Sequence, residues 1–336
     1  MIALDANGAD GGPRVVAEGA LRAAADVLTF GPAIELDGLP SVVDAPRFVA
    51  NDEHPLEGLR ARPDASIAQA ARAVAEGRAE ALVSAGHTGA TLAASLEHLG
   101  LLEGVERAAL AVLLPGATGP STLLLDAGAG LRANGPQLVG FAHLGVAFMS
   151  SVAGVDRPRV ALLSVGAETG KGTPEVLAAA HELARSPLRF VGNVEGGDLL
   201  AGSADVVVCD GFTGNVALKA IEGAARLALG GVRDALASGT RARLGGLLVR
   251  PALRRLARRV DPNAHGGAIL LGLRRPVVVA HGASSADGVA AAIALARRAV
   301  DERMVERTAA ALAAGVQSVS VASFAPGFAR GSRISS

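Results

Sequence analysis

Residues 206–219 read VVVCDGFTGNVALK, an apolar run that enters an acid–glycine turn and continues as a helix-forming stretch. Three consecutive valines favour a buried strand, and an acid followed by glycine suits the start of a helix. The order of strand, glycine-rich turn and helix start recurs at residues 82–90, 125–130, 163–172 and 279–285. Apolar strands that alternate with helices predict a mostly parallel sheet covered on both faces, so we expect a three-layer α/β/α fold.

The remaining elements follow from periodicity and from helix-end signals. Strands are predicted at residues 2–4, 81–84, 110–114, 122–125, 160–165, 190–194, 206–209 and 277–280. Helices are predicted at residues 14–27, 67–76, 88–98, 137–153, 175–184, 215–229 and 287–299. Gly77 and Gly100 stand where helix-ending glycines belong, and Pro13, Pro136 and Pro174 stand where a first helical turn accepts proline.

The composition excludes several classes of protein. The 336 residues are half hydrophobic, which excludes a disordered chain. With 32 basic and 32 acidic residues, no Trp, no Tyr and only 8 Phe, the chain lacks the basic excess of a nucleic-acid binder and has few of its aromatic rings. A single cysteine, the absence of a signal sequence and the absence of a membrane-length apolar run predict a cytoplasmic protein.

One basic segment interrupts the alternation of strands and helices. Residues 230–260 are rich in arginine and predict a helical hairpin, with Pro251 at the start of its second helix. Such a hairpin can be a solvated pair of helices, a docking surface for an acidic carrier protein or an interfacial contact with an anionic membrane. We expect one domain over residues 1–314 with this insertion, a loop-and-strand excursion at 31–63, and a Ser/Gly/Ala-rich tail at 315–336.

The glycine-rich turns predict a phosphate or oxyanion site. In a parallel sheet they would all lie at the carboxyl edge, where backbone N–H groups at helix starts bind anions. Residues 166–172 lack the spacing and the hydroxyl of a nucleoside-triphosphate loop, and residues 128–133 match a dinucleotide fingerprint only weakly. No zinc spacing or serine-hydrolase elbow is present in the sequence, so we expect no metal and no cofactor.

Two further side chains are candidates for catalytic groups. Cys209, which ends an apolar strand, is more typical of a small core residue than of a nucleophile. His281, at the end of another strand, can be a base, a hydrogen-bond donor to phosphate or a structural turn residue. Lys171 and Lys219 are the only lysines of the chain.

Several motifs resemble the bacterial phosphate acyltransferases of phospholipid synthesis. They are DANGADGGP at residues 5–13, VSAGHTGA at 83–90, GNVEG at 192–196, VVCDGFTGNVALK at 207–219 and AHG at 280–282. The resemblance covers residues 2–299. It implies a fold related to isocitrate dehydrogenases and phosphotransacetylases, a homodimer, and transfer of a long acyl chain from acyl carrier protein to inorganic phosphate.

The resemblance and the turn chemistry together give a set of site residues. Phosphate needs no covalent enzyme intermediate, so catalysis is expected to rest on positioning and on stabilising the oxyanion. The expected catalytic residues are His281, Lys171, His87 and Asp210, with either histidine as the proton-transfer group. The expected phosphate- or substrate-binding residues are Asp5, Gly86, Thr88, Gly89, Asn193, Glu195, Gly211, Thr213, Gly214, Asn215, Lys219 and Ser284.

Four positions depart from the family's pattern. Asn7 stands for Met, Ala9 for Gly, His87 for Asn and Ala167 for Glu. A divergent paralogue, either a coenzyme A-dependent phosphate transacylase or an acyl-transfer subunit, is therefore kept as the alternative. A nicotinamide oxidoreductase ranks lower because tyrosine and a clustered arginine site are missing, and a non-catalytic membrane scaffold ranks last.

Overall fold

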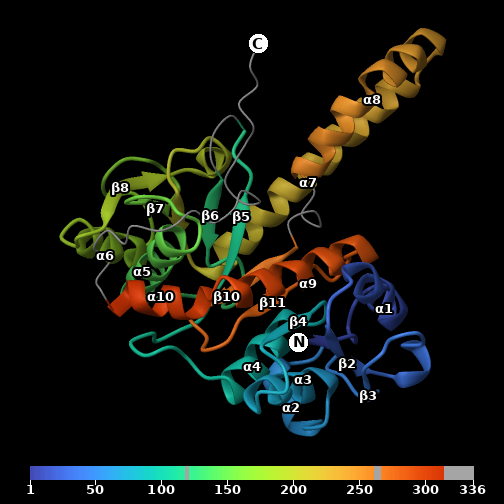
Figure 1. Ribbon diagram of the computed structural model, residues 1–336. Coiled ribbons are helices and arrows are strands. Elements are labelled where there is room, and N and C mark those ends of the chain that lie inside the picture. Colours follow the sequence, from blue (N-terminus) through green and yellow to red (C-terminus); the bar gives the residue numbers. More distant parts are fainter. Residues whose placement is uncertain (118–120, 261–265, 314–336) are drawn as a thin grey trace.

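The computed structural model of the chain describes residues 1–117, 121–260 and 266–313, in which 11 strands form one sheet (Figure 1). The strands are β1 (Ile2–Asp5), β2 (Val27–Gly31), β3 (Val42–Asp44), β4 (Ala81–Ser84), β5 (Ala109–Leu114), β6 (Thr122–Leu125), β7 (Arg159–Leu163), β8 (Arg189–Val194), β9 (Val206–Val208), β10 (Ala268–Leu271) and β11 (Val277–Val279). The helices are α1 (Gly12–Ala23), α2 (Pro55–Ala61), α3 (Ser66–Ala75), α4 (Thr88–His98), α5 (Gly135–Ser151), α6 (Pro174–Leu183), α7 (Gly211–Ala237), α8 (Thr240–Val260), α9 (Ala286–Asp301) and α10 (Met304–Ala313), with short 3-10 turns η1 (Ala33–Glu35) and η2 (Gly196–Leu200).

The sheet consists of two parallel halves that run in opposite directions. Its order is β3-β2-β1-β4-β11-β10-β5-β6-β9-β7-β8. β10 is antiparallel to β11 and to β5, and β5 is antiparallel to β6, so three successive reversals separate the halves. The prediction that all five glycine-rich turns share one edge is therefore wrong. The turns after β4 and β11 lie at one edge, and those after β6, β7 and β9 lie at the opposite edge.

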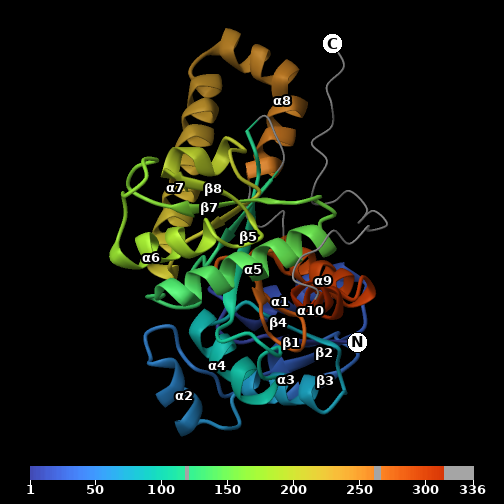
Figure 2. The same cartoon turned by 90° about the vertical axis from the view of Figure 1, so that its left-hand side faces the viewer.

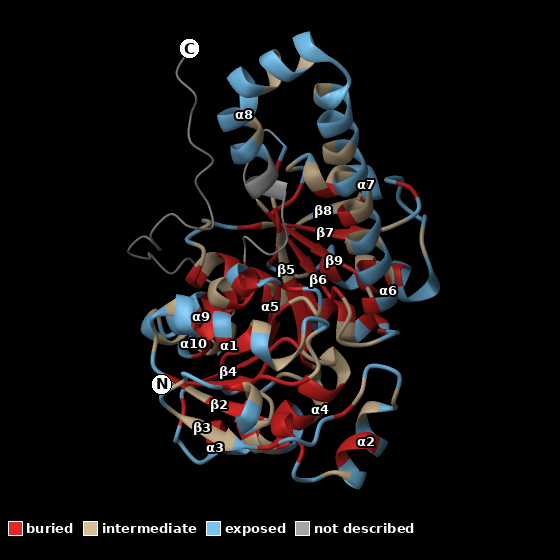
Figure 3. Ribbon diagram, turned by 90° about the vertical axis from the view of Figure 1, so that its right-hand side faces the viewer, coloured by how far each residue is buried: buried red, intermediate tan, exposed pale blue. Residues whose placement is uncertain are grey.

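Two apolar clusters, one on each face of the sheet, make the core. In β1, Ile2 and Leu4 belong to the cluster that also contains residues of α1, α5, α6, α9 and α10, whereas Ala3 belongs to the cluster with residues of α2, α3, α4 and α7. Because both faces of the strands are covered, the strands show no polar alternation. Figure 3 shows the buried strands between exposed helix surfaces, which confirms the predicted three-layer α/β/α fold.

Most predicted elements are confirmed, and the misses have local causes. The strand at 81–84 and the helix at 88–98 are found as predicted, and Gly77 and Gly100 have φ of 76° and 71°. The first helix ends at Ala23 rather than at residue 27, because Ala24 is left-handed and Val27 starts β2. Strands β2 and β10 and helices α2 and α10 were not predicted as elements. The predicted loop-and-strand excursion at 31–63 contains η1, β3 and α2.

The basic hairpin is longer than predicted. α7 and α8 project together away from the sheet (Figures 1 and 2). Pro251 lies inside α8 and does not start it. Proline removes one hydrogen bond from a helix interior, but α8 is exposed enough here for water to satisfy the freed carbonyl of Leu247. The side chains of Arg258 and Arg259 and the whole 315–336 tail lie outside the described residues.

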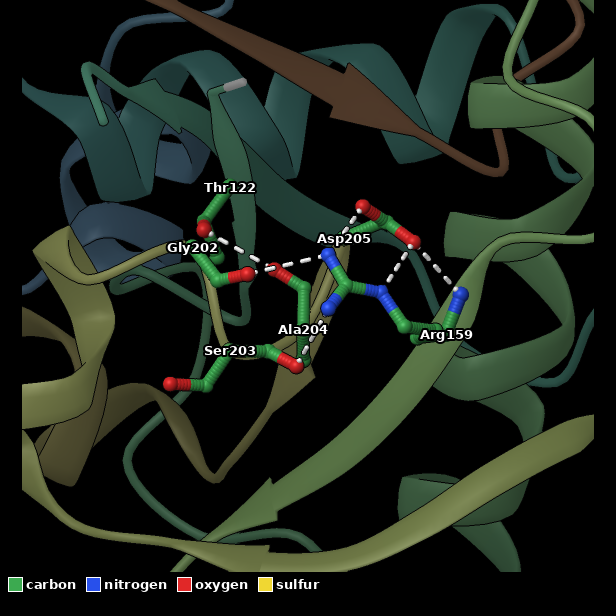
Figure 4. A network of polar contacts seen from close by, with 6 residues as sticks. All are labelled: Thr122, Arg159, Gly202, Ser203, Ala204 and Asp205. Atoms are coloured by element: carbon green, nitrogen blue, oxygen red, sulfur yellow. Dashed lines mark hydrogen bonds and ion pairs between the residues drawn. The ribbon is translucent and has the colours of Figure 1, made fainter. Parts of the chain in front are cut away.

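An ion pair with several carbonyl contacts fastens β7 to β9 at the end away from their glycine-rich turns (Figure 4). The Arg159 guanidinium donates to Asp205 at 2.9 Å and to the carbonyls of Gly202 and Ser203. Burial alone would raise the pKa of Asp205, but the Arg159 side chain and backbone N–H lower it below its ordinary value. The Arg159–Asp205 ion pair therefore holds the start of β7 next to the start of β9, and the carboxylate of Asp205 in it is charged.

Candidate active site

A cluster of Lys219, Glu222 and His281 joins the two halves of the sheet. His281 follows β11, whereas α7 begins after β9, at the opposite edge. Lys219 lies nine residues past Asp210, about 13 Å along the helix axis at 1.5 Å per residue. α7 thereby carries Lys219 to His281, and the Lys219 Nζ lies 2.6 Å from the His281 Nε2.

The His281 ring is held by its own turn. Its Nδ1 accepts a hydrogen bond from the Ala283 N–H at 3.1 Å, and its carbonyl accepts one from the Ser284 N–H at 2.8 Å. A 2.6 Å bond between the His281 and Lys219 nitrogens needs a lone pair on one of them. Because Nδ1 accepts, the neutral ring carries its proton on Nε2, and the lone pair then belongs to the Lys219 Nζ. Such a pair can take a proton from a substrate on the lysine nitrogen and give one from the imidazole.

The carboxylate of Glu222 completes the cluster. Its Oε2 lies 2.9 Å from the Lys219 Nζ and 3.7 Å from the His281 Nε2. Contact with His281, and secondarily with Lys219, lowers the pKa of Glu222 to about 2 despite burial. Glu222 is not among the residues expected from the sequence, although its position three residues after Lys219 on a predicted helix is a usable signal.

Asp5 is the centre of a second, buried polar network. Its carboxylate accepts hydrogen bonds from Ser66 Oγ at 2.6 Å and from Ser84 Oγ at 2.8 Å. Asn7 donates to Ser66 Oγ and to the Ala45 carbonyl. Burial raises the pKa of Asp5 to about 6, although these hydrogen bonds act to lower it. With both carboxylate oxygens occupied, Asp5 orients neighbouring groups.

His87 begins α4 as its N-cap. The ring Nδ1 accepts a hydrogen bond from the Gly89 N–H at 3.0 Å, and Nε2 lies 3.3 Å from the Glu53 carbonyl. Together these contacts place the proton of the neutral ring on Nε2, and burial lowers the pKa of His87. Both ring nitrogens are thus engaged, as is the Gly86 N–H, which donates to Ser84 Oγ. Thr88, at the first position of α4, has no acceptor for its N–H within its own helix.

The glycines of the 206–219 stretch make room for the turn after β6. A Cβ on Gly211 would lie 2.0 Å from the Gly130 carbonyl oxygen, and one on Gly214 would lie 1.9 Å from that of Asp126. The Asp126 carboxylate itself accepts hydrogen bonds from four backbone N–H groups, of Leu110, Gly128, Ala129 and Gly130. The glycine-rich turn that resembled an anion site therefore already holds the chain's own carboxylate.

Asp210 and Thr213 form the start of α7. Asp210 accepts hydrogen bonds from the Thr213 N–H at 2.8 Å and from its Oγ1 at 3.0 Å, which is N-cap geometry. Asn215 lies over Gly128. Cys209 is buried and burial raises the pKa of its thiol well above the ordinary value, which agrees with a core residue rather than a nucleophile.

Lys171 belongs to the turn after β7. Asn193, on β8, holds this turn by donating to the carbonyls of Lys171 at 3.0 Å and Glu168 at 3.4 Å. Glu195 starts η2, where its N–H donates to Asp198. The Lys171 side chain is exposed.

The expected site residues thus fall into two groups. Those at the ends of β1, β4 and β11 are Asp5, Gly86, His87, Thr88, Gly89, His281 and Ser284. Those at the opposite edge are Lys171, Asn193, Glu195, Asp210, Gly211, Thr213, Gly214 and Asn215. Lys219 is the residue that connects the groups, through its contact with His281.

Comparison with known proteins gives a family match over most of the chain. Residues 1–307 match the family model for fatty acid synthesis proteins. A phosphate acyltransferase of Heliobacterium modesticaldum is 43% identical over 319 residues, which cover 90% of this chain and 95% of that protein. A phosphate acyltransferase of Thermobifida fusca is 44% identical over 324 residues, covering 91% and 89% of the two chains.

Solved structures share the fold at low sequence identity. A phosphotransacetylase from Streptococcus pyogenes superposes with a TM-score of 0.58 at 19% identity, covering 90% of this chain and 94% of that one. A branched-chain phosphotransacylase from Enterococcus faecalis gives a TM-score of 0.54 at 17% identity, covering 92% and 99%. Within residues 1–117, 121–260 and 266–313, no helix is long and apolar enough to span a membrane.

Proposed function

The chain belongs to the family of fatty acid synthesis proteins, and we propose that it transfers a fatty acyl group from the thioester of acyl carrier protein to inorganic phosphate. The product is an acyl phosphate, which supplies phospholipid synthesis. The enzyme is an acyltransferase, and the coenzyme A alternative is not favoured, since the matched relatives are phosphate acyltransferases.

The reaction requires one bond to form and one to break. A phosphate oxygen attacks the thioester carbonyl carbon, the carbonyl oxygen becomes an oxyanion, and the carbon–sulfur bond then breaks. The proton of monohydrogen phosphate ends on the released thiol, so the reaction consumes no other acid or base. A group that takes the proton from phosphate and returns it to sulfur would accelerate both steps.

His281 and Lys219 supply this group in the proposal. The proton on the His281 Nε2 can pass to the departing sulfur while the Lys219 Nζ takes the proton of phosphate and returns it to Nε2. The positive charge that Lys219 gains in this step attracts the phosphate. Thr88 N–H, Ser284 and the more distant Lys171 are proposed to contribute to phosphate binding. Asp5 and Asp210 orient these turns, because a carboxylate next to a phosphate dianion would repel it. The 2.6 Å contact between Lys219 and His281 is the observation that carries the proposal.

The test is a direct assay with acyl carrier protein loaded with a long acyl chain, phosphate, and capture of acyl phosphate as its hydroxamate. We expect His281→Gln to lower kcat about 100-fold or more, the usual effect of losing an acid–base group. The matched variant His181→Gln, on the exposed surface of α6, should keep wild-type kcat. Wild-type enzyme that makes no acyl phosphate from this donor, or that prefers acyl coenzyme A, would contradict the proposal.

The hairpin is proposed to bring a homodimeric enzyme to anionic membranes. Near its far end, Leu244, Leu247 and Leu248 are 61%, 63% and 84% exposed, and arginines flank them. Exposed leucines among arginines suit an interface between lipid headgroups and acyl chains. Flotation with vesicles of anionic and of neutral lipid tests this contact, and light scattering tests the dimer. Equal flotation of the wild type and an Arg254→Ala/Arg255→Ala variant on anionic vesicles would contradict the proposed role of these charges.

A further inference from the structure

Glu222 is a buried carboxylate on a helix that is otherwise largely exposed. α7 has 27 residues, and its buried members are Gly211, Gly214 and Glu222, so Glu222 is its one buried residue with a side chain beyond Cα. The Glu222 side chain is 6% exposed, against 46% for Lys219 and 33% for His281. Burial of a charge is costly unless partners offset it, and here both partners belong to the proposed active site.

The three side chains form a compact triangle. The Glu222 Oε2 is 2.9 Å from the Lys219 Nζ, the Lys219 Nζ is 2.6 Å from the His281 Nε2, and the third side measures 3.7 Å. Lys219 and Glu222 are three residues apart on one helix, so their pairing is set locally. His281 arrives from the other half of the sheet, and its position relative to Lys219 depends on where Glu222 holds the ammonium group.

The charge of Glu222 also acts on His281. Three charged groups face the His281 turn: Lys219 and Glu222 from α7, and Asp10, close to Gly282, from the turn after β1. The positive charge of Lys219 opposes protonation of the ring, and the carboxylate of Glu222 favours it at a comparable distance. Without Glu222 the imidazole would face an uncompensated ammonium group and would hold a proton less readily.

On the basis of the proposed function, we propose that Glu222 is a positioning residue for acyl transfer: it holds Lys219 against His281, so that the pair can take the proton of phosphate and give one to the departing thiol. The carboxylate stays charged throughout and forms no bond to the substrate. A buried carboxylate of this kind is expected to affect the chemical step more than the affinity for phosphate.

The test compares three variants in steady-state assays with acyl carrier protein thioester and phosphate. We expect Glu222→Gln to lower kcat by about 10- to 100-fold, with the KM for phosphate within about threefold of wild type. The alkaline limb of the pH–rate profile should move to lower pH by about one unit, because a charge within 4 Å of the acid is lost. Glu222→Asp should recover about half of that displacement, and Asp301→Asn, which breaks the exposed pair with Arg297, should leave kcat and the pH profile unchanged.

A second measurement follows the proton on His281 without turnover. The ring C–H resonance of His281, identified by its loss in His281→Gln, is titrated by NMR in wild type, Glu222→Gln and Glu222→Asp. We expect its midpoint to fall by about one pH unit in Glu222→Gln. An unmoved midpoint and an unmoved alkaline limb would overturn the inference, whatever the loss in kcat.

The two hypotheses fail in different ways. Wild-type enzyme that makes no acyl phosphate contradicts the proposed function, yet the NMR titration still tests the coupling of Glu222 to His281. If Glu222→Gln does not melt cooperatively, Glu222→Asp decides, because its shorter side chain moves the charge away from the ring. A His281 titration midpoint in Glu222→Asp that is identical to wild type overturns the inference.

Discussion

Gly214 is the position where one added methyl group should damage both the fold and the site. A Cβ there would lie 1.9 Å from the Asp126 carbonyl oxygen, 2.9 Å from its carbonyl carbon and 3.0 Å from the Cys209 Sγ. The obstacle is backbone, and Asp126 is itself fixed by four N–H groups that donate to its carboxylate. α7 would have to move away from the turn after β6, and Lys219 lies only five residues further along that helix.

The size of the effect follows from the stiffness of this contact. Overpacking typically costs 1–3 kcal/mol, and we expect Gly214→Ala to reach about 3 kcal/mol because no flexible side chain can yield. Unfolding entropy of about 2.1 cal/mol/K per residue gives roughly 0.7 kcal/mol/K for this chain, so Tm should fall by about 4 °C. The kcat for acyl phosphate formation should fall as well, since the contact between Lys219 and His281 is displaced.

Differential scanning calorimetry and the hydroxamate assay measure the two effects. Gly231→Ala is the matched control on the same helix, because a Cβ there meets nothing within 4 Å. Alanine is a better helix former than glycine by about 1 kcal/mol, so the control should raise Tm by about 1 °C and leave kcat unchanged. Equal melting temperatures of Gly214→Ala and wild type would refute the packing explanation for this glycine.

Three further changes are expected to have measurable effects. Lys171→Met should raise the KM for phosphate strongly, and an unchanged KM would remove Lys171 from the site. Arg159→Met should lower the free energy of unfolding at pH 7 by about 3 kcal/mol, because Asp205 keeps a buried charge without its partner. This loss of stability should shrink as the pH falls through the lowered pKa of Asp205, because the carboxylate becomes neutral there. Urea titrations of the wild type and Arg159→Met at pH 7 and at pH 3 measure the loss at each pH. Asp5 has a pKa raised to about 6, so the folded state binds a proton between pH 4 and 6 that the unfolded state has lost, and stability falls as the pH rises through that window. This decrease in the free energy of unfolding amounts to about 3 kcal/mol at 1.36 kcal/mol per pKa unit. Asp5→Asn should reduce the decrease. An identical pH dependence of stability in both proteins would show that Asp5 does not cause it.

Local sequence patterns were sufficient for the elements and for the kinds of side chain at the site. The apolar strands without polar alternation predicted a sheet covered on both faces, and capping and proline signals located the helix starts at Pro13, Pro136 and Pro174. His281 was selected because it adjoins a strand–turn–helix junction, and Lys219 because it ends the motif that resembles the family and is one of two lysines; the structure brings the two to 2.6 Å. These features depend on residues close together in the chain, which is why a single sequence could reveal them.

The strand directions and the functions of individual turns required the tertiary structure. The reversal of the second half of the sheet depends on the pairing of β10 with β11 and β5, and residues 268–271 carry no local signal of direction. The sequence predicted anion-binding glycines at Gly211 and Gly214, but long-range packing against residues 126–130 shows why a side chain cannot fit there. The role of a glycine or of a carboxylate such as Glu222 is set by what lies opposite it, and in this protein the opposite group is distant in sequence.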